Sequence, residues 1–289
     1  MVKTDDSEAT ISYGIVLSMF KKHIAIPQDH GSWVFLLSPL LIGLSAGGTL
    51  RFASLILVVA AMAAFLLRQP VSIAVKVWSG RRPRSDLRPA LFWTAVYGGV
   101  LFFFLLWLVW LGHGRLLWLG LPAGGVFCWY LWLVKKRSER RQMGLEIVAS
   151  GVLALAAPAA LWVGENAYAP QGWLLWALCW LQSATSIVYA YLRLEQRVWV
   201  AIPSRLVDRL RPATRALLYA TFNVLLTVFL GSYRFIPPFV WLAYALQWVV
   251  CLYGSLQPAV GMRPTRIGLR QLTVSTLFTV LFIWLWRAG

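Results

Sequence analysis

The chain has 289 residues, of which 60% are hydrophobic and 13% charged, and its formal net charge is +17. A composition this apolar excludes an ordinary soluble domain. The apolar residues fall in uncharged blocks long enough to cross a bilayer core of roughly 30 Å. Because that core offers no water to backbone amides, each block is expected to be a helix. The sequence therefore predicts an all-α, polytopic integral membrane bundle.

Residues 1–32 are predicted to form a cytoplasmic N-terminal segment. The segment opens with acidic residues, and its apolar run 11–20 ends in Lys21 and Lys22. This is the reverse of the charge order of a signal peptide. We interpret 11–22 as a short helix lying at the membrane interface, which Pro27 discourages from continuing.

The stretch "PQDHGSW", residues 27–33, places a carboxylate and an imidazole directly before the first apolar block. Asp29 could cap the first transmembrane helix. Alternatively, it could hold one imidazole nitrogen of His30 and leave the other for a ligand. Under the second interpretation, His30 and Asp29 are the candidate catalytic residues, with His30 as the acid–base group. The sequence leaves both interpretations open.

The sequence then shows about nine candidate transmembrane helices. Their ranges are 33–50, 52–67, 90–111, 116–134, 147–164, 171–192, 216–231, 235–256 and 271–286. Almost no soluble sequence separates them, so we expect a single transmembrane domain over residues 1–289. Cys128, Cys179 and Cys251 lie within these blocks, without the spacing of a metal site or a disulfide framework. We therefore interpret the cysteines as core residues and expect no metal site.

The basic residues predict the orientation. With the N-terminus inside, the cytoplasmic segments are 1–32, 68–88, 135–141, 193–215 and 263–270. These segments hold all but four of the 27 lysines and arginines, the exceptions being Arg51, Arg115, Arg234 and Arg287. The bias follows the positive-inside rule. It predicts a multi-pass protein of the cell membrane, with the N-terminus cytoplasmic and the C-terminus outside. Topology accounts for the basic charge, so no nucleic-acid partner is expected.

Two of the cytoplasmic loops, 68–88 and 193–215, resemble each other. Arg68 and Arg193 each end a block, and each loop closes with an aspartate followed by Arg-Pro-Ala, at 88–90 and 211–213. Internal repeats of this kind often build transporters or membrane enzymes around a central cavity. We therefore expect both loops to form short helices over one cavity mouth.

Polar residues recur at helical spacing in the later blocks. The sixth block carries Gln182, Ser186, Tyr189, Arg193 and Arg197 along one helix face. The seventh adds Tyr219, Asn223 and Thr227, and the eighth adds Tyr244 and Gln247. Unpaired polar groups in lipid are costly, so these stripes should face one another or a cavity. For Arg193 and Arg197 the alternative is contact with anionic headgroups.

Several motifs of the sequence resemble those of a known family. "PQDHGSW" and the following "SPLLIGL" are similar to the start of the YwiC-like family of bacterial membrane proteins, whose motif reads Pro–acidic–His–Gly–Ala–Trp. Ser32 stands where alanine is usual. The Arg68-Gln69-Pro70 turn and the segments "YLRLEQR" and "RPTRIGLRQ" also resemble that family. Membership implies a polytopic membrane protein with no assigned reaction.

A more distant likeness is to the UbiA-type intramembrane prenyltransferases. These have nine helices, with functional loops after the second and sixth, where the two repeated loops fall. The likeness implies a UbiA-like arrangement of helices. Those enzymes carry two aspartate-rich motifs that hold Mg²⁺, whereas the first loop here has only Asp86 and the second only Glu195 and Asp208. We therefore expect no Mg²⁺ and no other cofactor.

Two classes of function stay open, and the sequence does not decide whether the protein is an enzyme. In the first, it binds an anionic isoprenoid or lipid ligand in a cavity open to the cytoplasmic side. The candidate ligand-binding residues are Arg68, Lys76, Arg81, Tyr189, Arg193, Glu195, Arg197 and Asp208. In the second, it is a transporter or a non-catalytic partner of a respiratory or envelope complex, and membrane lipids contact its basic loops. The sequence identifies no protein partner.

Overall fold

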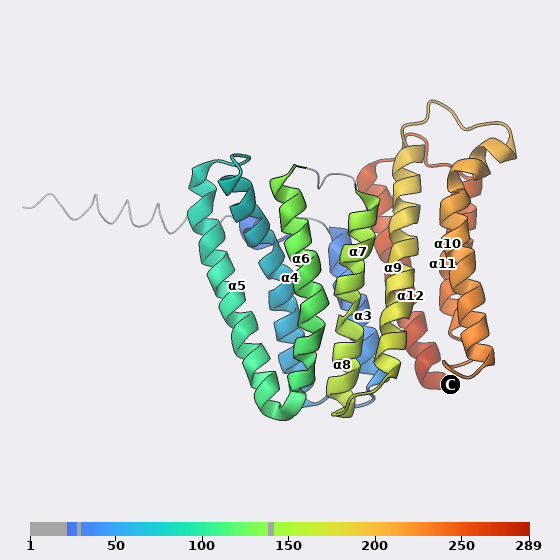
Figure 1. Cartoon of the computed structure of the whole chain (residues 1–289). Helices are drawn as coiled ribbons and strands as arrows, with labels where there is room; N and C mark the ends of the chain where they lie inside the picture. Colours follow the sequence, from blue (N-terminus) through green and yellow to red (C-terminus); the bar gives the residue numbers. More distant parts are fainter. Residues whose placement is uncertain (1–21, 28–29, 138–141) are drawn as a thin grey trace, which may run out of the picture. The chain divides into compact units, whose positions relative to one another are not determined.

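A computed structural model of the chain describes residues 22–27, 30–137 and 142–289. Their regular secondary structure is helical throughout, as Figure 1 shows. The all-α class is therefore confirmed. Most of the predicted interfacial helix 11–22 lies outside the described residues, as does Asp29.

The helices are α2 (Lys22–Ala25), α3 (His30–Ala46), α4 (Phe52–Trp78), α5 (Leu87–Leu108), α6 (Leu117–Lys135), α7 (Met143–Ala154), α8 (Ala156–Glu165), α9 (Gln171–Gln196), α10 (Leu206–Ser232), α11 (Trp241–Leu256) and α12 (Pro264–Ala288). Three short helices are η1 (Arg84–Asp86), η2 (Val109–His113) and η3 (Gly114–Leu116). Each predicted block coincides with one helix or, for 147–164, with the pair α7 and α8.

Six helical segments of the described residues are long and apolar enough to cross a membrane. One of them, Arg84–Lys135, is interrupted at Gly112, whose φ of 91° is a conformation that favours glycine. Helices α3 and α11 are apolar but shorter. A multi-pass membrane protein is thus supported, whereas the count of nine spans and the UbiA-like arrangement stay predictions.

The boundaries of the two repeated loops differ from expectation. The predicted Arg68-Gln69-Pro70 turn is wrong, because α4 continues through it to Trp78. A proline inside a helix costs one backbone hydrogen bond and a steric adjustment. Here, burial of Ile73, Ala74 and Val77 in an apolar cluster offsets that cost.

In the second loop, α9 extends to Gln196 and α10 begins at Leu206. Apart from η1, the helical parts of both loops are thus extensions of long helices.

The chain forms two compact units. The first holds α2, α5, residues 55–78 of α4 and residues 127–135 of α6 among its described parts. Its apolar cluster joins α2, α4 and α5 through Ile24, Ile73, Ala74, Val77 and Ala90. The second unit holds α3 and α7–α12, with residues 115–126 of the chain. Whether the two form one membrane domain stays a prediction.

In the second unit, α3 packs against α8 at glycines. A Cβ added at Gly43 would lie 2.2 Å from the carbonyl oxygen of Ala157. A Cβ at Gly164 would lie 3.0 Å from the Cα of Gly47. Gly43 and Gly47 have the four-residue spacing at which small residues let two membrane helices approach closely. Glycine is therefore required at this contact for lack of space.

The segment 143–165 is broken near its middle. Helix α7 ends at Ala154 and α8 begins at Ala156. Pro158 has no N–H to donate to the carbonyl of Ala154, four residues earlier. All residues of α8 from 157 to 164 are buried. A backbone carbonyl without its helical partner is tolerated at membrane depth where protein covers it, and α3 and α9 both pack on α8.

Candidate functional site

The predicted polar stripe of α9 is buried in the second unit. Gln182, Ser186, Tyr189 and Arg193 are each no more than 6% exposed. The stripes contact one another: Gln182 Nε2 donates to Gln247 Oε1 on α11 at 3.3 Å. Tyr219 is an exception, because it is exposed on α10. Arg197 is a second exception, because it is half-buried and follows the end of α9. For the remaining stripe residues, the prediction of an inward-facing polar surface is confirmed.

Asn223 makes the best-defined contact between α9 and α10. Its Nδ2 donates to the carbonyl of Leu181 at 3.0 Å and to Thr185 Oγ1 at 2.9 Å. Interhelical hydrogen bonds in membrane proteins contribute roughly 0.6 kcal/mol each and up to about 1.7 kcal/mol. We therefore expect Asn223→Ala to lower the free energy of unfolding by about 1 kcal/mol.

Reversible unfolding of the purified protein in a denaturing detergent would measure this change. Thr276→Ala is a suitable control, because Thr276 is exposed and its Oγ1 donates to the carbonyl of Leu272 on its own helix. A loss of stability in Thr276→Ala as large as that in Asn223→Ala would contradict the prediction.

Arg193 binds the end of α11. Its Nη1 donates to the carbonyl oxygens of Gly254 at 2.6 Å and Gln257 at 2.8 Å, and to Gln196 Oε1 at 2.8 Å. A cation at the C-terminal carbonyls of a helix is favoured by their partial negative charge. The side chain is 3% exposed. Arg193 therefore holds α9 to the end of α11, and ligand binding by it stays a prediction.

Tyr189 lies next to this arginine. The Arg193 Cζ is 5.9 Å from the centre of the Tyr189 ring. The ring is buried against Gly254, where an added Cβ would lie 2.1 Å from the tyrosine oxygen. Tyr189 and Arg193 are thus brought together, as the ligand hypothesis requires, but within a packed contact between α9 and α11.

Three predicted ligand-binding residues belong to the first unit. Arg68 lies over the ring of Phe65, with its Cζ 5.2 Å from the ring centre. Arg81 Nη1 donates to the carbonyl of Val134 at 2.5 Å. Lys76 lies in the last turn of α4. Because these residues and the stripe of α9 belong to different units, convergence of the two loops on one cavity stays a prediction.

The remaining predicted site residues are placed as follows. Glu195 and Asp208 are exposed, near the end of α9 and the start of α10. Arg197 is half-buried, and its carbonyl accepts a hydrogen bond from the amide of Gly261 at 3.1 Å. His30 is the first residue of α3, but its side chain and Asp29 lie outside what the structure describes. The catalytic assignment therefore stays a prediction.

A pocket of about 340 Å³ lies in the second unit among α3, α7, α9 and α12. Its walls are mainly apolar, with a few polar side chains. They consist of Gly31, Val34, Phe35, Glu146, Ser186, Ile187, Ala190, Leu194, Pro264, Ile267, Gly268, Gln271, Leu272 and Ser275. Of the polar stripe predicted on α9, only Ser186 lines it. Sequence reasoning missed the pocket.

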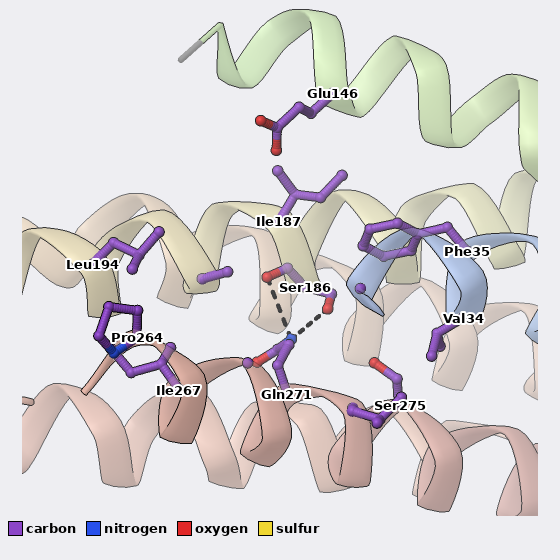
Figure 2. Close-up of a pocket in the computed structure, with 14 residues that line it drawn as sticks. Val34, Phe35, Glu146, Ser186, Ile187, Leu194, Pro264, Ile267, Gln271 and Ser275 are labelled. Atoms are coloured by element: carbon purple, nitrogen blue, oxygen red, sulfur yellow. Dashed lines mark hydrogen bonds between the residues drawn. The ribbon is translucent and has the colours of Figure 1, made fainter. Parts of the chain in front are cut away.

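The polar side chains of the pocket come from three helices. Gln271 Nε2 on α12 donates to both oxygens of Ser186 on α9, and Figure 2 shows these two residues facing each other. Glu146 projects from α7 toward the pocket in the same view, and its Oε1 accepts a hydrogen bond from Tyr191 at 2.8 Å. An acidic residue in the first turn of α7 also complements the helix dipole.

A smaller chamber of about 10 Å³ adjoins this pocket. Both are lined by Val34, Phe35, Ser186 and Ser275. The chamber adds Ser38, Cys179, Gln182, Ser183 and Phe278. These additional residues precede Ser186 on α9, follow Phe35 on α3 or follow Ser275 on α12. The chamber therefore lies further from the helix ends that surround the pocket.

The pocket lies where three helices begin and one ends. Gly31 is the second residue of α3, Glu146 is in the first turn of α7, and Pro264 is the first residue of α12. Leu194 is two residues before the end of α9. Arginines adjoin this end of the unit: Arg263 and Arg266 are exposed beside Pro264 and Ile267. A basic surface therefore adjoins an apolar pocket.

Comparison with known families agrees with the motif at the start of α3. Residues 26–161 match the model of the YwiC-like protein family. The chain contains a YwiC-like region. It spans "PQDHGSW" and the helices from α3 into α8, so the predicted resemblance is confirmed over this region. The segments "YLRLEQR" and "RPTRIGLRQ" lie outside the match, and their likeness stays a prediction. Two of the four pocket helices, α3 and α7, belong to the YwiC-like region, and α9 and α12 follow it.

No match to a curated protein or to a solved structure is found. The likeness to UbiA-type enzymes therefore stays a prediction. Among the described residues, no group of three or more His, Cys, Asp or Glu side chains lies close enough to hold a metal ion. The pocket instead offers amide and hydroxyl groups, which can orient a ligand by hydrogen bonds.

Proposed function

We propose that this membrane protein binds an amphiphile of the lipid class. An apolar acyl or isoprenoid chain would occupy the pocket of the second unit, and an anionic head would lie at its arginine-rich end. The observation that carries the proposal is the apolar pocket of about 340 Å³ beside a basic surface. Ligand pockets commonly have about 300–1,000 Å³, apolar walls and a few polar groups.

The walls suit a hydrocarbon chain. Val34 and Phe35 contribute from α3, Ile187 and Leu194 from α9, and Ile267 from α12. A chain between these residues gains dispersion contacts and leaves no polar group of its own without a partner. A free sugar or nucleotide would instead place many hydroxyl or phosphate groups against apolar walls, at a large desolvation cost.

Charge at the end of the pocket suits an anionic head. The guanidinium groups of Arg263 and Arg266 are exposed next to wall residues, and each could bind two phosphate or carboxylate oxygens. The N-termini of α3 and α12 add the positive ends of their helix dipoles. Under the topology that the basic residues predict, this end faces the cytoplasm. Of the ligand-binding residues predicted from sequence, Arg193 and Glu195 lie nearest to this end along the chain, on either side of the wall residue Leu194.

Filling the pocket tests the proposal. Gly268 lines it, and no atom lies within 4 Å of an added Cβ, so Gly268→Phe should occupy the pocket without a backbone clash. Gly120→Phe is a matched control, because Gly120 is also exposed, helical and open, and lies outside the pocket. Mass spectrometry would measure the lipids that co-purify with the detergent-extracted protein. We expect about tenfold less of one enriched anionic lipid with Gly268→Phe, equivalent to about 1.4 kcal/mol of binding free energy.

The control and the wild-type protein should retain that lipid in equal amounts. Bulk phospholipid alone on the wild-type protein would contradict the proposal and would favour a transporter or a non-catalytic partner of a membrane complex. Equal retention by Gly268→Phe and Gly120→Phe would show that the bound lipid lies elsewhere.

A further inference from the structure

Gln182 has a buried oxygen without a hydrogen-bond donor. The side chain is 6% exposed and lines the small chamber. Its Nε2 donates to Gln247 Oε1, whereas its Oε1 has no partner within the described part of the chain. A buried acceptor left without a donor destabilises the folded state, and such acceptors usually bond a water molecule or a ligand. A donor is therefore expected from inside the chamber.

Four serines line the chamber, and the hydroxyl protons of two of them, Ser38 and Ser183, are already engaged. Ser183 Oγ donates to the carbonyl of Cys179 at 2.9 Å. Thr279 Oγ1 donates to the carbonyl of Ser275 at 2.8 Å, so in the contact between Ser38 Oγ and Thr279 Oγ1, at 2.6 Å, Ser38 is the donor. A hydroxyl group has one proton and two lone pairs. Ser38 and Ser183 thus offer the chamber acceptors, as Gln182 does.

The volume limits what can enter. The chamber has about 10 Å³, and roughly 10–15 Å³ of such space holds one water molecule. A polar group of the size of one hydroxyl fits, whereas a carboxylate or phosphate does not. An anion would also meet the lone pairs of Gln182, Ser38 and Ser183, which repel it.

We propose that this chamber is a subsite for a single hydroxyl group, which donates a hydrogen bond to Gln182 Oε1. The hydroxyl group belongs either to a water molecule or to the inner end of the amphiphile. Entry of a ligand hydroxyl through the larger pocket rests on the proposed function. The chamber then selects among amphiphiles, since a chain ending in a methyl group leaves Gln182 without a donor and one ending in a hydroxyl group does not.

A matched pair of alkyl phosphates tests this selection. The two probes have the same chain length, and one ends in a methyl group and the other in a hydroxyl group. We expect the wild-type protein to bind the hydroxyl-ended phosphate about fivefold more tightly, as measured by competition with a fluorescent lipid. Gln182→Met keeps the length of the side chain and removes the acceptor, so it should abolish the preference. Gln171→Met, an exposed position at the start of the same helix, should preserve it.

The outcomes separate this inference from the proposed function. Equal binding of both phosphates by the wild-type protein overturns the ligand hydroxyl as the donor and leaves the lipid pocket intact. Binding of neither phosphate overturns the lipid pocket. The chamber is then judged on the ligand-free protein, in a structure that resolves ordered water. Density within hydrogen-bond distance of Gln182 Oε1 assigns a water molecule. An empty chamber that the hydroxyl-ended phosphate fills assigns the ligand, and a chamber empty in both states overturns the inference.

Discussion

The Gly43→Ala protein should lose much of its stability, although the substitution adds a single methyl group. The new Cβ would lie 2.2 Å from the carbonyl oxygen of Ala157 and 2.9 Å from its carbonyl carbon and Cα. These are backbone atoms of α8, so no side-chain rotation can relieve the contact. Helices α3 and α8 would have to separate, and overpacking of this kind typically costs about 1–3 kcal/mol and occasionally more.

Gly31→Ala is the matched control. Gly31 lies on the same helix, and no atom lies within 4 Å of an added Cβ. Alanine is favoured over glycine inside a helix by roughly 0.5–1 kcal/mol, so this control should be unchanged or slightly more stable. Tryptophan fluorescence during heating of the detergent-solubilised protein would report the midpoint of unfolding. Equal midpoints for the two variants would contradict the close contact between α3 and α8.

The second large effect is expected for Arg193→Ala. Removing the guanidinium leaves the carbonyl oxygens of Gly254 and Gln257 and the side chain of Gln196 without this donor. Buried polar groups left unpaired cost about 1–3 kcal/mol each, although partial access of water lowers the sum. We therefore expect a loss of about 3 kcal/mol in the free energy of unfolding, measured on protein stripped of lipid.

Arg197→Ala provides the comparison, because Arg197 is half-buried and one turn further along the same face. Its substitution should change the free energy of unfolding by less than about 1 kcal/mol. If Arg193 served only to bind a ligand, Arg193→Ala would unfold in the lipid-free state as the wild-type protein does. That result would refute the role of Arg193 at the end of α11.

Much of the fold could be predicted because insertion into a membrane restricts the secondary structure that an apolar segment can adopt. An apolar block such as 171–192 has only helical ways to satisfy its backbone in lipid, and α9 covers all of it. The polar spacing of Gln182, Ser186 and Arg193 also predicted a buried face. The path of α4 through Pro70 could not be predicted, since it depends on the apolar partners that residues 73–77 meet in the folded unit.

The candidate pocket was harder to predict because it lies among residues with little chemical signal. Glycine, isoleucine and valine are common in every membrane helix. Only the packing of the folded unit makes Gly268, Ile267 and Val34 part of a pocket wall. A usable sign was the spacing of Gly268, Gln271 and Ser275, which puts small and polar residues on one face of α12. The four-residue spacing of Gly43 and Gly47 was likewise visible in the sequence.

The break between α7 and α8 has a consequence for the order in which the protein is made. At roughly 1.5 Å per residue, neither helix alone spans a core of about 30 Å, so they cross the bilayer only together. The carbonyl of Ala154 lacks the N–H of Pro158, and exposing such a group to lipid is costly. The α7–α8 segment therefore needs the packing of α9 to shield this carbonyl from lipid, and α9 begins only at Gln171. When the nascent chain has left the ribosome as far as Glu165, it already contains the whole YwiC-like match. It still lacks α9, so the packing around that match is not yet complete.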